Sequence, residues 1–288
     1  MNTSVFRILI LTLILVVCLG SGSAIAADIP VKAPPRPVDP GWNWSGFYLG
    51  GNAGYSWGRS STDIDIICAG VGVGGTCPVV GQTAYSANHK LNLNGPLGGA
   101  QAGFNMQNGG WVFGIEADIQ WAGQKGGASF TCPAQVCNSG DVGPALAIVS
   151  GTLDQKLTWF GTLRGRIGIA SGAWLAYVTG GLAYGELKSS GVLAGVTQGG
   201  PATSLAFSSR DRNLGWTVGG GLEAALGRSN WSAKLEYLYM DLGNFEQTVA
   251  FATTFPPVDV RFDSRVTDHI LRIGLNYRFG ADPVAARY

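Results

Sequence analysis

The sequence has little charge and no long hydrophobic run in its main part, and these two shortages limit the class of protein. Charged residues make up 13% of the 288 residues, about half the share of roughly 25% in soluble domains. The net charge is +1, so no strong basic field would gather nucleic acid, and we expect no nucleic-acid partner. The only long aliphatic run, residues 8–19, is shorter than the roughly 20 residues that a membrane-spanning helix needs.

The first 26 residues have the pattern of a secretory signal peptide. Arg7 precedes the aliphatic run, and a stretch ending in an Ala-x-Ala site, Ala24 to Ala26, follows it. This pattern predicts cleavage after Ala26 and export. Cys18 lies inside the signal, behind Val17 where a lipoprotein signal has a small residue, so we expect no acylation there. Residues 27–41 contain five prolines and are expected to form an extended periplasmic tether.

Glycine and aromatic residues are abundant instead, and apolar and polar residues alternate along eight segments. The chain has 45 glycines and nine tryptophans. In the clearest segment Phe113, Ile115 and Ala117 alternate with Glu116 and Asp118, which is typical of a strand with two unlike faces. The predicted strands are about 44–58, 96–107, 111–122, 155–169, 174–187, 213–226, 231–241 and 262–279.

The predicted connections alternate in length, as they do in outer-membrane barrels, which have long outer loops and short periplasmic turns. A closed barrel is the remaining way for an exported chain without a membrane-spanning helix to cross a membrane. We therefore expect an all-β, eight-stranded antiparallel up-and-down transmembrane β-barrel over residues 42–279, in the bacterial outer membrane, with a C-terminal tail at 280–288. The long loops are expected at 59–95, 123–154, 188–212 and 242–261.

The tryptophans give an independent indication, because they fall at strand ends. Indole prefers the membrane interface, where its ring is half in apolar surroundings and its N–H stays hydrated. A soluble barrel of the lipocalin type would bury the apolar face inside, which is the reverse arrangement. The predicted interface girdle comprises Trp44, Trp111, Trp174 and Trp231, with Trp42, at the periplasmic ends, and Trp57, Trp121, Trp159 and Trp216 at the outer ends.

The charged face of the strands is expected to line the lumen, which eight strands leave only just wide enough for side chains. Buried charges need partners, and counting from the turn at 227–230 places Glu223 opposite Lys234 as a cross-strand ion pair. A charge-paired plug and a narrow pore for small solutes both remain open. The predicted lumen charges are Glu116, Asp118, Lys156, Arg164, Arg166, Glu223, Lys234, Glu236, Asp268, Arg272 and Arg278.

Cysteine and histidine are the remaining candidates for chemistry. Four cysteines follow the signal, and the shortest loops come from pairing Cys68 with Cys77 and Cys132 with Cys137, as disulfides of an exported protein. Metal binding is the rival, but no histidine or carboxylate cluster flanks either pair. His89, expected in an outer loop, could ligate haem, and His269 at the outer rim could serve a lipid-modifying enzyme. No Ser–His–carboxylate spacing is present, so we expect no enzyme, no metal and no cofactor.

Three stretches carry a resemblance to a known family: the run at 42–58 (WNWSGFYLGGNAGYSWG), the run at 177–185 (YVTGGLAYG) and the ending at 271–279 (LRIGLNYRF). They resemble the immunogenic outer-membrane porin-like family of alphaproteobacteria. The resemblance implies one eight-stranded barrel, similar to the membrane domain of outer membrane protein A, with outer-membrane lipid around it and host or envelope ligands at its loops. Either Phe279 or Tyr288 would then carry the aromatic assembly signal.

Overall fold

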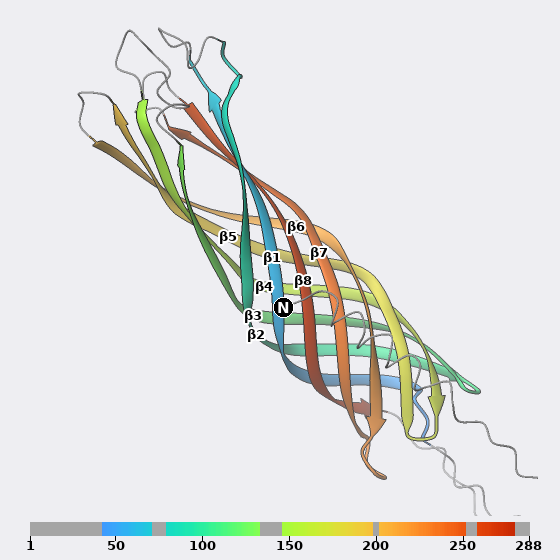
Figure 1. The fold of residues 1–288 in the computed structure, drawn as a ribbon. Helices are drawn as coiled ribbons and strands as arrows, with labels where there is room; N and C mark the ends of the chain where they lie inside the picture. Colours follow the sequence, from blue (N-terminus) through green and yellow to red (C-terminus); the bar gives the residue numbers. More distant parts are fainter. Residues whose placement is uncertain (1–41, 71–78, 133–145, 198–201, 252–257, 280–288) are drawn as a thin grey trace, which may run out of the picture. The chain divides into compact units, whose positions relative to one another are not determined.

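Eight β-strands in chain order close into one antiparallel barrel in the computed structural model (Figure 1). The structure describes residues 42–70, 79–132, 146–197, 202–251 and 258–279. Each strand pairs with the next, and β8 pairs back with β1, so the predicted up-and-down barrel is confirmed. The strands are β1 (Gly46–Cys68), β2 (Thr83–Asn108), β3 (Trp111–Cys132), β4 (Leu146–Ser171), β5 (Trp174–Thr197), β6 (Ala202–Ala225), β7 (Trp231–Phe251) and β8 (Val258–Phe279).

Short turns gather at one end of the barrel, which we call the turn end. β2 and β3 are separated by two residues, and so are β4 and β5. Gly109 (φ +60°) and Gly172 (φ +57°) occupy the left-handed backbone region in these turns, which is accessible to glycine at little cost. The strands at the opposite end, the extended end, continue as long ribbons beyond the main barrel wall (Figure 1).

All strands except β8 run about ten residues further toward the extended end than the alternation pattern predicts, and β8 runs a few residues further. β1 continues to Cys68 and β2 starts at Thr83, so most of the predicted loop 59–95 is paired strand. The predicted loops 123–154, 188–212 and 242–261 are shortened in the same way. The ladders continue because alternation persists there with the two faces exchanged, as Asp63 and Asp65 alternating with the buried Ile64 and Ile66 show.

This exchange divides the barrel into two halves. In the half near the turn end, the turn half, β1 exposes Phe47, Leu49 and Trp57 and buries Tyr48 and Ser56. Beyond Trp57, in the extended half, apolar side chains turn inward. One inner cluster there contains Ile64, Ile66, Cys68, Phe130, Cys132, Leu153, Leu193, Val258, Val260 and Phe262.

A second apolar cluster fills the barrel between that one and the polar interior of the turn half. Leu93, Leu157 and Phe160 are among its completely buried members. The described ranges contain no helix that is long and apolar enough to cross a membrane. The described interior is therefore packed with side chains. It is polar in the turn half and mainly apolar in the extended half, where Ser60, Thr62, Gln155 and Ser264 form a small buried group joined by hydrogen bonds.

Candidate functional site: the charge network inside the barrel

Arg164 of β4 occupies the centre of the turn half, where it is 1% exposed. Its Nη2 lies 2.5 Å from Glu116 Oε1 and 2.8 Å from Asp118 Oδ2, and its Nη1 lies 3.0 Å from Glu236 Oε1. Its Nε donates to Thr162 Oγ1 at 2.8 Å. One guanidinium thus connects carboxylates of β3 and β7 across the lumen.

Two further cations complete this centre. Arg272 of β8 places Nη2 2.6 Å from Glu236 Oε2 and 2.9 Å from Asp118 Oδ2. Lys234 of β7 donates from Nζ to both carboxylate oxygens of Glu116, each at 2.9 Å. Short charge-assisted bonds of this kind are the stronger class of hydrogen bond, so they hold β3, β4, β7 and β8 in one arrangement.

Arg166 forms a second centre closer to the turn end. Its Nη1 lies 3.2 Å from Glu223 Oε2 on β6, and its Nε donates to Asn105 Oδ1 at 2.8 Å. The guanidinium carbon is 4.7 Å from the ring centre of Tyr48 and 5.2 Å from that of Tyr177. These rings supply a cation–π contact, and their hydroxyls donate to carboxylates of the first centre.

The two centres contain equal numbers of carboxylates and cations. A buried ion pair is tolerated only when its charges are matched and hydrogen-bonded, and all eight side chains take part in ion pairs within 4 Å. The network therefore balances its charge internally. Its carboxylates are Glu116, Asp118, Glu223 and Glu236, and its cations are Arg164, Arg166, Lys234 and Arg272.

The predicted ion pair between Glu223 and Lys234 is wrong, although their register is as expected. The two residues are direct partners in the β6–β7 ladder. Lys234 instead bonds to Glu116, while Glu223 pairs with Arg166 and accepts from Ser232 Oγ at 2.6 Å. A long lysine side chain in a narrow lumen reaches the opposite wall, and register alone does not choose its partner.

The prediction that Lys156 lines the lumen is also wrong, because Lys156 is exposed on the outer surface. The register between β4 and β5 shifts between Leu157 and Trp159. Such a bulge adds one residue and reverses the faces beyond it. Leu157 is therefore completely buried where Lys156 was expected.

The remaining predicted lumen charges lie at either side of the network. Asp268 accepts hydrogen bonds from Ser56 Oγ at 2.6 Å and Gln124 Nε2 at 2.6 Å, on the side of the extended half. Arg278 lies at the turn end, with its guanidinium carbon 4.8 Å from the ring centre of Trp42.

Trp44 is not part of an outer girdle, contrary to the prediction, because it is 3% exposed. It packs inside the turn end with Val112, Leu175 and Tyr177, and its ring lies 5.8 Å from that of Trp42. The reason is that residues 42–45 precede β1. The backbone N–H of Trp44 donates to Gln107 Oε1 at 2.8 Å, which holds this segment against the mouth of the barrel.

Trp42 likewise precedes β1 and packs against this inner cluster, whereas the remaining predicted girdle tryptophans lie on the outer face of their strands. Six are exposed, and Trp159 is half-buried, with its ring 5.9 Å from that of Tyr184. One row near the turn end contains Trp111, Trp174 and Trp231, and the other, at the boundary between the halves, contains Trp57, Trp121, Trp159 and Trp216.

Comparisons with known proteins fit this arrangement of an apolar outer band and a polar interior. The family described as "Outer membrane protein beta-barrel domain" matches residues 14–279. The chain belongs to this outer-membrane β-barrel family. The 31 kDa outer-membrane immunogenic protein of Brucella melitensis biotype 1 is 35% identical over 269 residues, covering 89% of this chain and 94% of that protein.

A second relative of the outer-membrane barrel is the 25 kDa outer-membrane immunogenic protein of Brucella abortus biovar 1. It is 27% identical over 263 residues and covers 90% of this chain and 92% of its own length. Among solved structures, the outer membrane protease OmpT from Escherichia coli aligns with a TM-score of 0.42 at 12% identity, over 81% of this chain and 97% of that one. This structural similarity is too low to indicate anything about the activity of the present chain.

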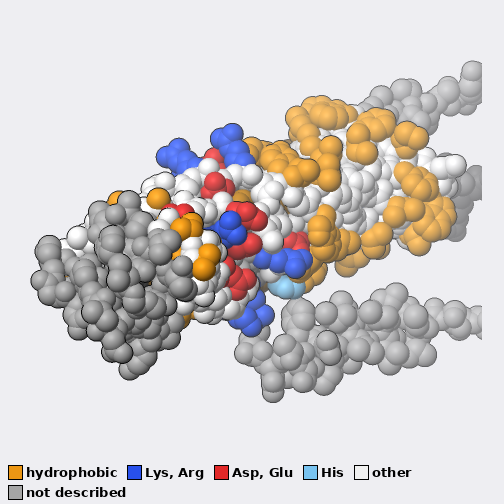
Figure 2. Space-filling model, turned by 90° about the horizontal axis from the view of Figure 1, so that it is seen from above, with side chains coloured by type: hydrophobic (Ala, Val, Ile, Leu, Met, Phe, Trp, Pro, Cys, Tyr) orange, Lys and Arg blue, Asp and Glu red, His pale blue; other side chains and the backbone are white. Residues whose placement is uncertain are grey.

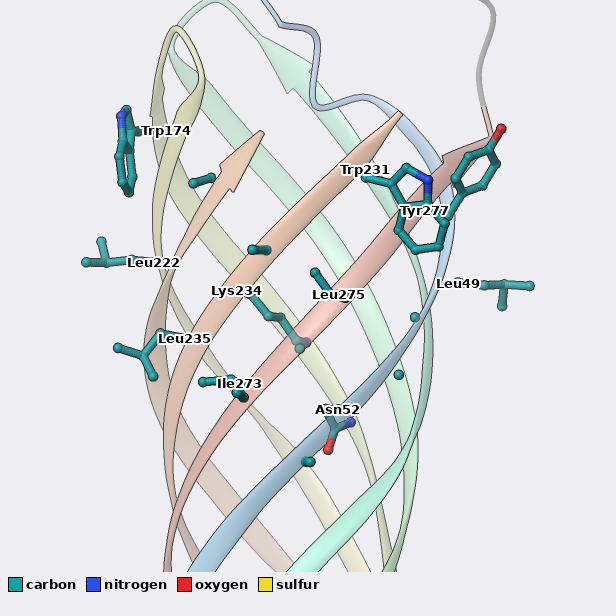
Figure 3. Close-up of a pocket in the computed structure, with 16 residues that line it drawn as sticks. Leu49, Asn52, Trp174, Leu222, Trp231, Lys234, Leu235, Ile273, Leu275 and Tyr277 are labelled. Atoms are coloured by element: carbon teal, nitrogen blue, oxygen red, sulfur yellow. The ribbon is translucent and has the colours of Figure 1, made fainter. Parts of the chain in front are cut away.

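The outer face of this outer-membrane barrel has a shallow apolar groove in the turn half, shown in Figure 3. Trp174, Trp231 and Tyr277 lie at its turn-end side. Small residues such as Ala233 form its floor, and their short side chains create the depression between the larger neighbours. The groove holds about 1140 Å³. Leu49, Leu222 and Leu235 project outward around it (Figure 3), so its walls match a hydrocarbon surrounding.

Of the cysteines and histidines that the structure describes, Cys68, Cys132 and His89 lie in the extended half of the outer-membrane barrel. Cys68 and Cys132 are each disulfide-bonded and buried. Cys77 and Cys137 lie outside the described residues, so the local pairing stays a prediction. His89 is not a loop residue as expected, because strand β2 contains it. Its ring lies half-buried, 6.5 Å from Phe130.

Several neutral polar residues of the network were not foreseen. Tyr48 Oη donates to Glu116 Oε2 at 2.7 Å, and Tyr177 Oη donates to Glu236 Oε1 at 2.9 Å. Asn276 Nδ2 donates to Glu223 Oε1 at 2.8 Å. Their position on the polar face of the alternation was the available signal, since a tyrosine there cannot contact lipid.

Proposed function

We propose that this outer-membrane barrel is a closed, non-catalytic surface protein that presents its extended half to the outside, rather than a porin or an enzyme. The observation that carries this proposal is the continuous filling of the interior. Solutes would have to pass the aromatic layer of Trp44, the charge network, and two apolar clusters in turn. An apolar, packed constriction also opposes the entry of water and ions.

The orientation follows from chain topology. Barrels of this class place short turns in the periplasm and long segments outside. The extended half has a polar outer face that includes Arg59, Asp63 and Lys125, which suits contact with water and with outside ligands. The relatives named as immunogenic support exposure at the cell surface.

A catalytic role has little support from the histidine at the rim. His269 Nδ1 lies 2.6 Å from Tyr237 Oη, and its ring packs 5.2 Å from that of Tyr239. In the described ranges, no hydrogen bond or ion pair joins the imidazole ring of His269 to a carboxylate side chain or a serine hydroxyl, and the contact with the Asp268 carboxylate is made by the His269 backbone. This arrangement fits an interfacial aromatic cluster better than an acid–base pair.

Planar-bilayer conductance tests the closed lumen. Purified protein, shown to be folded by heat-shifted migration on a denaturing gel, is added to a bilayer, with a general porin as the positive control. We expect no reproducible conductance steps. Reproducible unitary steps from folded protein would favour the narrow porin and overturn the proposal.

Labelling of intact cells tests the orientation. A cysteine introduced as Asp63→Cys lies in the extended half, and Arg228→Cys lies in the turn between β6 and β7. A membrane-impermeant maleimide is expected to label the first variant on intact cells and the second only after the envelope is opened. The reverse pattern would invert the orientation.

A further inference from the structure

Four basic residues stand directly opposite one another on the outer face of the extended half. Lys125 of β3 pairs with Lys156 of β4, Lys156 with Lys188 of β5, and Lys188 with Arg210 of β6. Neighbouring strands are about 4.8 Å apart, so this basic row crosses about 14 Å of surface. Like charges in directly opposed positions destabilise a sheet, and four in succession are costly unless an anion binds them.

Nearby carboxylates neutralise the row only in part. Glu186 lies 3.2 Å from Arg212 Nε and 3.9 Å from Lys188 Nζ. Lys125, Lys156 and Arg210 have no ion pair within 4 Å in the part of the chain that the structure describes. Asp154 lies two positions from Lys156 on the same exposed face, so it is a second carboxylate close to the row. The row therefore retains a net positive charge.

The row lies in a groove that also offers neutral hydrogen-bond donors. The groove holds about 600 Å³ and is lined by the four basic residues together with serines of β5 and β6. Ser190 and Ser208 are direct cross-strand partners and are exposed on the outer face. Lysine, arginine and serine together are the usual partners of phosphate oxygens.

The height of the row on the barrel identifies the kind of anion. Lys156 is three residues from the girdle residue Trp159, and Arg210 is six residues from Trp216. The guanidinium of Arg212 extends back to within 6.0 Å of the Trp159 ring centre. Figure 2 shows charged side chains gathered directly beside the apolar band. Lipid headgroups occupy this level next to an aromatic girdle.

We propose that the basic row binds the phosphate groups of a phosphorylated lipid headgroup in the leaflet that surrounds the outer girdle. The lipid's acyl chains would lie against the apolar band below, and its phosphates would bridge strands β3 to β6. The choice of the outer leaflet rests on the proposed orientation. Binding of the lipid to the protein in detergent does not depend on the orientation of the barrel in the membrane. The lipid site and the proposed orientation can therefore be disproved independently.

Native mass spectrometry of the detergent-solubilised full-length protein tests the site. The probes are bis-phosphorylated lipid A, the same lipid after removal of its phosphates, and inorganic phosphate. The test variant combines Lys125→Gln, Lys156→Gln and Arg210→Gln. Since each basic residue near a membrane surface contributes on the order of fivefold in affinity, we expect at least about a tenfold loss of phosphorylated-lipid binding.

The charge-matched control combines Lys90→Gln, Arg228→Gln and Arg261→Gln, three positions without an ion pair within 4 Å in the described structure. It is expected to bind the phosphorylated lipid like the wild type, and the dephosphorylated lipid should bind all three proteins equally. Heat-shifted migration confirms that each variant is folded. Equal binding of the phosphorylated lipid by the test variant and the control would overturn the proposal. Strong binding of inorganic phosphate alone would replace the lipid with a soluble anion.

Discussion

The two halves of the barrel obey opposite packing rules on the same strands. In the turn half, β1 directs Tyr48 and Ser56 inward and Leu49 outward, whereas in the extended half it directs Ile64 inward and Asp63 outward. β1 makes this change without a bulge at the boundary. The direction in which a side chain points is therefore fixed by the pleat, and the chemistry of each face follows the solvent outside it.

The difference shows what holds each half together. The extended half has an apolar core under a hydrated surface, so the hydrophobic effect stabilises it as in a soluble barrel. In the turn half, the outer side chains contact lipid that is as apolar as they are, so the hydrophobic effect does little to stabilise it. The arrangement of its strands is held instead by hydrogen bonds and ion pairs inside the barrel. Substitutions of equally buried side chains should therefore lower the stability of the two halves for different physical reasons.

The largest effect is expected from Arg164→Ala in the turn half. The substitution leaves Glu116, Asp118 and Glu236 with one fewer cation in a buried site, which costs about 3–5 kcal/mol. Urea unfolding of the barrel in lipid vesicles measures the loss. Arg212→Ala is the control, because that side chain is 74% exposed and its ion pair contributes at most about 1 kcal/mol. Equal losses would contradict an energetically important network.

Phe262→Ala tests the core of the extended half. Phe262 is 2% exposed, stacks on Phe207 at 5.3 Å and contacts Phe130 edge-on at 6.3 Å. Loss of a buried phenyl ring costs about 3 kcal/mol. Because the cavity is local, we expect faster proteolysis of the extended half with little change in the turn half. Arg261→Ala on the outer face is the control, and equal proteolysis of both variants would argue against an apolar core there.

A smaller effect is expected from Gly103→Ala in the turn half. A β-carbon at Gly103 would collide with the Tyr48 ring and approach the Ile115 carbonyl oxygen to 2.7 Å. Overpacking of this kind costs about 2 kcal/mol. Gly109→Ala is not a suitable control because of its positive φ, whereas Gly98→Ala meets only one atom, at 3.5 Å. Similar urea midpoints for both variants would show that the Tyr48 contact is not tight.

Asp263→Asn in the extended half should have the smallest effect and the opposite sign. Partial burial, with Glu246 and Asp63 opposite on the neighbouring strands, raises the pKa of Asp263. The native state then binds more protons than the unfolded state, so this group's contribution to stability falls as pH rises through the raised pKa. The variant should be more stable by at most about 0.5 kcal/mol at neutral pH. The difference should vanish in acid, and a destabilised variant would contradict the repulsion.

Much of the fold follows from local alternation, and its failures have local causes. The eight strands, the short turns and the inward placement of Arg164 and Arg166 were predictable from period two. Lys156 was misplaced because a bulge next to Leu157 reverses the faces, and alternation cannot locate such a bulge. The strand extensions were missed because their apolar face is the inner one, although Ile64 and Ile66 display it.

The partners inside the lumen could not be predicted from the sequence. Register correctly placed Glu223 opposite Lys234, yet Lys234 bonds to Glu116, which is 118 residues away in the chain. Closure of the barrel brings these walls together, and only three-dimensional geometry decides which of several cations a carboxylate meets. Trp44 was assigned to the girdle for a similar reason, because the fold of a segment before the first strand has no periodic signal.

The exchange of faces between the two halves is tested most directly by the accessibility of two nitroxide labels on the outer face of β1. Ala53→Cys lies in the turn half and Asp63→Cys in the extended half. With the protein in lipid vesicles, the label at position 53 should relax faster with oxygen, which concentrates in lipid, and the label at position 63 with a water-soluble nickel chelate. Lipid-type accessibility at both positions would contradict a hydrated extended half with an apolar core.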